Sequence, residues 1–186
     1  MPEILRRNQS RVLRVLPSPP QFDLNIINQS LWVLECEETI RQGTGFMLAG
    51  IGLVTCQHVL GTATHAIHPA SSYQRFSVRV LAQNSVVDLA ILSIDTSVGL
   101  ELTRGSADKL QQMTHIAVAG FPNFRLGDSG IISPGLVVGF RMMSGIRKIL
   151  TNAPIIAGNV TGYDRMEKAQ ETEEHGIIPI DVVKYL

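Results

Sequence analysis

The chain has 186 residues and a mass of 20.3 kDa, enough for one sizeable hydrophobic core or for two small cores that share an interface. Its formal net charge is +0 and aromatic residues make up 5% of it, so it offers neither a basic surface nor stacking side chains for nucleic acid. No apolar run approaches the length of a membrane span. We therefore expect no nucleic-acid partner and no membrane partner.

Residues 1–28 are predicted to form an N-terminal arm. Arginines alternate there with aliphatic residues, and no uninterrupted apolar run follows them, which does not fit a secretory signal peptide. A transit peptide or a basic helix on a membrane surface is the alternative to a solvated arm or a first strand. The proline-rich residues 17–20 separate this arm from the domain proper.

The chain contains two cysteines, Cys36 and Cys56. Two cysteines make no disulfide framework, and buried thiols in a reducing compartment are the simpler expectation. Together with the missing signal-peptide pattern, this predicts a cytoplasmic location.

The rest of the chain, residues 29–186, is predicted to be an all-β domain with two antiparallel barrels. Residues 29–100 contain about six short apolar stretches separated by glycine or polar turns, a spacing typical of a small barrel. Residues 93–114 are polar and irregular and suit a linker. Strand patterns resume in residues 115–186, the second barrel, which ends in a short helix over 181–186. The strands expected in this second half are His115–Gly120, Ile131–Ser133, Leu136–Phe140, Ile146–Leu150, Val160–Gly162 and Gly176–Ile180.

A hairpin in the first barrel leads to a histidine. Its strands are the apolar runs Phe46–Ala49 and Leu53–Thr55, and Gly50 and Gly52 lie between them. Glycine reaches positive φ without steric cost, so both positions suit a tight turn. The second run delivers His58 to the end of a strand, where a rigid scaffold can present a reactive group.

Asp88 lies within the apolar stretch Val86–Leu92. A carboxylate in such surroundings loses hydration, which is unfavourable unless a partner offsets the loss. An imidazolium is one suitable partner, so Asp88 and His58 are expected to meet. The alternative is that Asp88 caps a turn at the start of the strand, with backbone amides as its partners.

These two segments resemble the motifs of trypsin-like serine proteases, and most of all the compact bacterial HtrA-like branch. Gly43–Phe46 followed by Thr55–Val59 is similar to the family's histidine motif, and Asp88–Leu92 is similar to its aspartate strand. The resemblance implies a trypsin-like double barrel, with six strands in each barrel, and serine endopeptidase activity without a cofactor. It makes His58 the general base and then acid, and Asp88 the residue that orients it.

The family's nucleophile turn, Gly-x-Ser-Gly-Gly-Pro, does not occur in this sequence. Residues 151–159 resemble the segment that leads into it, and the resemblance assigns Gly158 and Asn159 to the oxyanion hole. The next residues, Val160–Tyr163, instead resemble the strand beyond the serine turn. We therefore predict that a segment of about a dozen residues or more, a hairpin with its turn, is missing between Asn159 and Val160.

The same resemblance assigns the residues that would bind a protein or peptide substrate in an extended conformation. Those before the nucleophile position line the pocket for the substrate side chain, and those after it form the strand edge that pairs with the substrate. No carboxylate is among the pocket residues, which predicts a preference for small or medium apolar side chains. The assigned residues are Pro154, Ile155, Ile156, Val160, Thr161 and Gly162.

Ser129 is a weaker candidate for the nucleophile. Gly127–Gly130 spells Gly-Asp-Ser-Gly, but Ile131 and Ile132 follow it, and the surrounding residues resemble an earlier hairpin of the family. Thr161 is weaker still, because its amide would belong to a strand. A metal site is not expected, since the His-x-x-His spacing of residues 65–68 has no third ligand pattern beside it.

A catalytically inactive pseudoprotease that binds an extended peptide is the alternative function. The sequence as it stands favours it, because no nucleophile can be identified. Loss of a central hairpin would, however, expose sheet edges and part of the core. This difficulty favours the endopeptidase.

Overall fold

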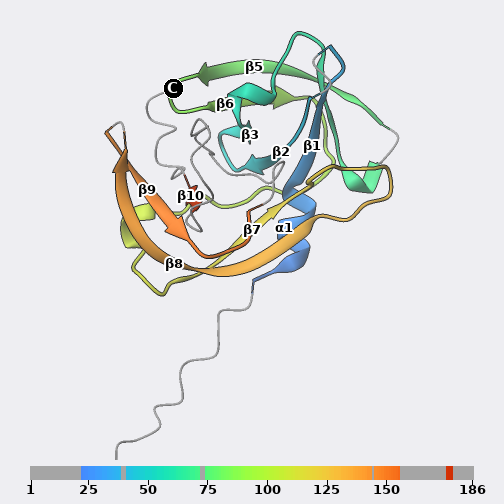
Figure 1. The fold of residues 1–186 in the computed structure, drawn as a ribbon. Coiled ribbons are helices and arrows are strands. Elements are labelled where there is room, and N and C mark those ends of the chain that lie inside the picture. Colours follow the sequence, from blue (N-terminus) through green and yellow to red (C-terminus); the bar gives the residue numbers. More distant parts are fainter. Residues whose placement is uncertain (1–21, 39–40, 72–73, 144, 156–174, 178–186) are drawn as a thin grey trace, which may run out of the picture.

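The structure is a computed structural model that describes residues 22–38, 41–71, 74–143, 145–155 and 175–177 (Figure 1). These residues are predominantly β, as predicted. The strands are β1 (Leu31–Cys36), β2 (Arg41–Leu48), β3 (Gly52–Thr55), β4 (Thr64–Ile67), β5 (Phe76–Asn84), β6 (Leu89–Ile94), β7 (His115–Gly120), β8 (Ile131–Met143), β9 (Ile146–Thr151) and β10 (His175–Ile177). The helical elements are α1 (Leu24–Ser30) and the 3₁₀ turns η2 (Gln57–Val59), η3 (Pro69–Ser71) and η4 (Ala107–Lys109).

The first barrel is closed. Its strands follow the order β1-β2-β3-β6-β5-β4, and β4 pairs with β1 to complete the ring. All pairings are antiparallel. Trp32, Leu34, Leu53 and Leu92 are fully buried in its core. The predicted first barrel is therefore confirmed.

Strand β1 is buried on both faces. Successive side chains of a strand point to opposite sides. Trp32 and Leu34 accordingly pack in the barrel core, while Leu31 and Val33 pack in a second cluster with Phe121 of the other half. This explains why the segment is apolar at four consecutive positions instead of alternating.

The second half contains a four-stranded antiparallel sheet in the order β10-β9-β8-β7. The two predicted strands Ile131–Ser133 and Leu136–Phe140 are a single long strand, β8, which Figure 1 shows as a curved ribbon. That division is wrong, because Pro134 does not interrupt the strand. Pro134 pairs opposite Ala117 of β7, and pairing with β9 begins only at Val137. One edge of β8 is thus open at the proline, where a residue without an N–H is tolerated.

Two elements predicted for the second half lie outside the described residues. These are the strand Val160–Gly162 and the helix over 181–186. The predicted strand Gly176–Ile180 overlaps β10 at its first two residues. Within the described ranges, this half is an open sheet.

Helix α1 is not among the predicted elements. Asp23 caps it, because its Oδ1 accepts hydrogen bonds from the backbone amides of Asn25 (3.0 Å) and Ile26 (3.1 Å). The signal was present in the sequence as an aspartate before Leu24 and Ile27, which lie on one side of a helical turn. No helix among the described residues is long and apolar enough to span a membrane.

His68 is a buried structural residue. Its Nδ1 accepts a hydrogen bond from the Ala70 amide (3.2 Å), so its Nε2 carries the proton and donates to the Gln29 carbonyl (3.1 Å). Burial lowers the pKa of His68, and the hydrogen bond to Gln29 opposes that shift. His65, three residues earlier, instead faces Glu35 with its Nε2 (3.3 Å).

We expect His68 to make the protein less stable in mild acid. Because its pKa is lower in the folded state, the unfolded chain binds the proton first as the pH falls below about 6.5. The free energy of unfolding then decreases, by at most about 1.4 kcal/mol per pH unit for this one group. Urea denaturation at pH 5 to 8 measures the slope. His68→Gln should flatten it, while His115→Gln, at an exposed position, should leave it unchanged.

Candidate active site

The pairing of β3 with β6 brings together two segments that are far apart in sequence. The strands are antiparallel and their last pair is Thr55 with Ala90. Residues just after β3 and residues just before β6 therefore leave the barrel at the same edge. A hydrogen bond from the Gln57 amide to the Asp88 carbonyl (3.3 Å) continues this association beyond the strands.

The hairpin before this edge forms as predicted. The turn between β2 and β3 has Gly50 at φ +71° and Gly52 at φ +123°. A Cβ atom on Gly52 would lie 2.7 Å from the Leu92 carbonyl oxygen, so glycine is required there for space as well as for conformation. The hairpin thus sets the start of β3 against β6, and the pairing of Thr55 with Ala90 holds the other end, where the chain turns into η2.

Asp88 holds His58 at two points. The Asp88 Oδ2 lies 2.6 Å from the His58 Nδ1, and its Oδ1 accepts a hydrogen bond of 2.9 Å from the His58 backbone amide. A carboxylate only accepts, so Nδ1 carries the proton and Nε2 keeps its lone pair. Among the described residues Nε2 has no hydrogen-bond partner, and the His58 side chain is 41% exposed. This arrangement leaves a fixed proton acceptor facing solvent.

Asp88 lies in the turn before β6 and not inside the strand. Its φ is +51°, a left-handed conformation that aspartate tolerates better than most residues. The Asn84 side chain shapes this turn by accepting a hydrogen bond from the Val86 amide (2.9 Å). Both interpretations of Asp88 therefore hold in part, because it contacts the imidazole of His58 and a backbone amide as well.

Thr44 ties the first barrel to the second half. Its buried hydroxyl accepts a hydrogen bond from the Phe121 amide (2.8 Å), and its carbonyl accepts one from the Thr55 hydroxyl (2.9 Å). The side chain lies in the Gly43–Phe46 motif, but no local pattern indicates a partner so distant in the chain. Thr44 connects the strand that leads to His58 with the other sheet.

Replacing Thr44 with valine should destabilise the protein by about 1–3 kcal/mol, because the buried Phe121 amide would lose its acceptor. Thr44→Ser keeps the hydroxyl and is the matched control. Chemical denaturation of both variants measures the difference. Equal stability of the two would show that the hydrogen bond to Phe121 contributes nothing.

Sequence comparison identifies the family of this chain. Residues 43–179 match the trypsin-like peptidase domain. The chain belongs to the trypsin-like peptidase family. The match includes both His58 and Asp88, and it confirms the resemblance drawn from the two motifs.

Solved structures show that the trypsin-like fold extends over most of the chain. An inactive serine-to-alanine mutant of Rv3671c from M. tuberculosis H37Rv aligns with a TM-score of 0.65 and 15% identity, covering 92% of this chain and 94% of that one. Deg5 aligns with a TM-score of 0.65 and 21% identity, covering 86% and 88% of the two chains. No curated protein matches the sequence.

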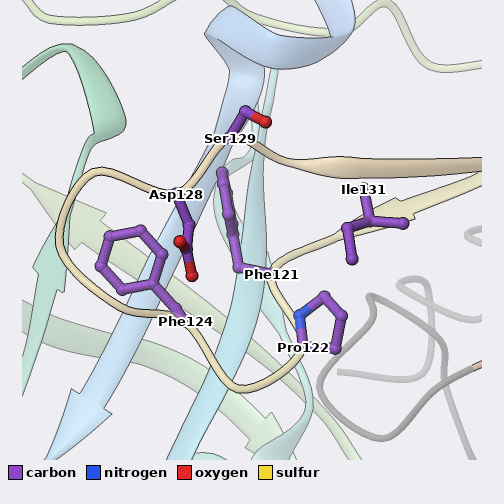
Figure 2. A pocket seen from close by; sticks show the side chains of 6 residues that line it. All are labelled: Phe121, Pro122, Phe124, Asp128, Ser129 and Ile131. Atoms are coloured by element: carbon purple, nitrogen blue, oxygen red, sulfur yellow. The ribbon is translucent and has the colours of Figure 1, made fainter.

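Ser129 lines a pocket of this trypsin-like peptidase. Figure 2 shows the pocket, which has a volume of about 270 Å³. Ser129 is exposed, and the next residue, Gly130, lies close to Asn28 of α1. In the described part of the chain no hydrogen bond joins Ser129 to His58. The lining residues are Phe121, Pro122, Phe124, Asp128, Ser129 and Ile131.

The predicted substrate segment of this trypsin-like peptidase begins directly after β9. Ala153 is buried against Gly135, where a Cβ atom would come within 2.6 Å of the Ala153 Cβ and amide nitrogen. Pro154 is exposed and Ile155 is half-buried. The remaining predicted site residues lie outside the described ranges: Ile156, Gly158, Asn159, Val160, Thr161 and Gly162.

Cys56 is a residue of this edge whose position the sequence did not reveal. Its thiol is buried, as expected from the sequence. Its Sγ also belongs to a group of donor atoms, with those of His58 and Asp88, that lie within 4.8 Å of one another. No disulfide joins it to Cys36.

Proposed function

We propose that this trypsin-like peptidase is a serine endopeptidase in which His58 is the general base and Asp88 orients it. The observation that carries the proposal is the two-point contact between them, at Nδ1 and at the backbone amide. It fixes the imidazole tautomer that leaves Nε2 able to accept a proton. An exposed histidine without such a carboxylate would be free to rotate and to change tautomer.

In the proposed reaction, Nε2 of His58 accepts the proton of a serine hydroxyl while that oxygen attacks the carbonyl carbon of the scissile peptide bond. Asp88 stabilises the imidazolium that results. The imidazolium then gives its proton to the leaving amine, which departs as the acyl-enzyme forms. Water, activated by His58 in the same way, releases the acyl group.

The nucleophile is proposed to lie in a segment of about a dozen residues or more between Asn159 and Val160 that this sequence lacks. Ser129 does not replace it in this proposal, because it makes no hydrogen bond with His58 within the described residues. Gly158 and Asn159 would contribute to the oxyanion hole. The substrate would be a protein or peptide in an extended conformation. Its small or medium apolar side chain would bind in a pocket lined by Pro154, Ile155 and Ile156.

Intact mass spectrometry combined with a fluorophosphonate probe tests the proposal. A mass about 1–2 kDa above that of the 186 residues, with labelling abolished in His58→Gln, is the expected result for the natural protein. Labelling at 20.3 kDa that Ser129→Ala removes would move the nucleophile to Ser129. A mass of 20.3 kDa without labelling would overturn the proposal.

That last outcome would favour the second candidate, a peptide-binding pseudoprotease. The specific observation behind it is the absence of any Gly-x-Ser-Gly-Gly-Pro turn in the sequence. A pseudoprotease should bind an extended apolar peptide without cutting it. Fluorescence anisotropy measures the binding, and mass spectrometry of the recovered peptide shows whether it has been cleaved.

A further inference from the structure

We propose that Cys56, His58 and Asp88 form a binding site for Zn²⁺ that switches off the proposed general base. Their donor atoms, one thiol sulfur, one imidazole nitrogen and one carboxylate oxygen, all lie within 4.8 Å of one another. The grouping follows from the pairing of β3 with β6. It places Cys56 and His58, the first and third residues after β3, near Asp88, the residue before β6.

The donor set matches the chemistry of zinc. Zn²⁺ binds cysteine sulfur at about 2.3 Å and imidazole nitrogen or carboxylate oxygen at about 2.0–2.2 Å, in tetrahedral geometry. Donors at those distances lie about 3.3–3.7 Å from one another around the ion. Binding would therefore separate the His58 Nδ1 and the Asp88 Oδ2 from their present 2.6 Å and close any pair that now approaches the 4.8 Å limit of the group.

The site is held rigidly on one side and open on the other. The Asp88 Oδ1 accepts a hydrogen bond from the His58 amide, which leaves Oδ2 as the oxygen that would face the metal. Cys56 is 8% exposed and is the N-cap residue of η2, so its backbone is fixed by the same turn. The His58 side chain is 41% exposed, and the ion would enter from that side with water as its fourth ligand.

Metal binding changes the tautomer of His58. Zinc needs the lone pair of Nδ1, so the proton now on Nδ1 leaves through water and a proton is taken up on Nε2. The imidazole stays neutral, while the Cys56 thiol releases one proton to solvent on becoming a thiolate. With Nε2 protonated, His58 can no longer accept a proton from a hydroxyl. This inhibitory consequence rests on the proposed endopeptidase function, whereas the binding site does not.

Cobalt substitution tests the site directly, because Co²⁺ occupies zinc sites and a thiolate ligand gives it an intense charge-transfer absorption. Tag-free protein titrated with Co²⁺ should develop this absorption at one equivalent, and Zn²⁺ should displace it. Cys56→Ala should abolish the absorption and weaken Zn²⁺ binding by at least the about 10–100-fold that loss of an outer-shell partner typically costs. Cys36→Ala is the matched control, since Cys36 is also a buried thiol but is not part of the cluster.

Two results would overturn the site: no thiolate absorption with the unaltered protein, or an absorption that survives in Cys56→Ala. Circular dichroism of each variant confirms that the fold is retained. The fluorophosphonate reaction is measured separately with and without Zn²⁺. Cobalt binding by a protein that never reacts with the probe would support the metal site and contradict only the endopeptidase function.

Discussion

Replacing Asp88 with asparagine is expected to slow peptide hydrolysis, and the reaction with a fluorophosphonate, by about 10⁴-fold, the effect that this change has in other serine proteases. The asparagine oxygen can still accept from the His58 amide, so the turn is retained. Its NH₂ group, however, would face Nδ1, which must then become an acceptor. The proton moves to Nε2, and His58 can then no longer act as the proposed general base.

Two measurements check this prediction. The labelling rate and kcat/KM give the loss of activity, and ¹⁵N NMR of the imidazole reports which ring nitrogen carries the proton, even in a protein without a nucleophile. The NMR spectrum should show Nδ1–H in the unaltered protein and Nε2–H in Asp88→Asn. Asp95→Asn is the control, because Asp95 is exposed and lies just beyond the other end of β6. An unchanged tautomer and rate in Asp88→Asn would contradict the assigned role.

Replacing Trp32 with alanine is expected to lower the free energy of unfolding by about 3–5 kcal/mol. Trp32 is 0% exposed and packs edge-on against Phe76 (5.5 Å between ring centroids) and His68 (4.7 Å). Removing the indole would leave a cavity that a closed barrel cannot collapse to fill. A loss of this size is a large part of the stability of an ordinary domain.

Trp32→Phe provides the contrast. The Trp32 Nε1 is buried and makes no hydrogen bond in the described structure, so phenylalanine keeps much of the aromatic packing and removes an unsatisfied donor. Its cost should therefore be well below that of Trp32→Ala. Urea denaturation of the three proteins gives both values. A similar loss for both variants would mean that Nε1 has a partner or that the ring edge packs more tightly than the structure indicates.

Local sequence signals predicted much of the first barrel. Gly50 and Gly52 marked the hairpin because only glycine suits the conformation of that turn. The apolar stretch around Asp88 raised the question of a partner for its carboxylate, and the structure places that carboxylate against His58. These inferences succeeded because each depended on a few neighbouring residues and on a family motif.

Other features depend on contacts between distant residues, which no local pattern reveals. The hydroxyl of Thr44 finds its donor at Phe121, and Cys56 approaches Asp88 only because β3 pairs with β6. The predicted strands stop at Ser133 and resume at Leu136, but the open edge of β8 at Pro134 lets a single strand continue through the proline. The roles of residues beyond Ile155 stay predictions, since the described structure does not include them.

Strand β1 contributes one face to the cluster around Trp32 and the other to the cluster around Phe121, so the two halves of the molecule share core residues. Separating the two halves would expose Leu31 and Val33 to water together with Phe121. The two halves should consequently unfold together. Differential scanning calorimetry should therefore show a single unfolding peak, with equal van't Hoff and calorimetric enthalpies.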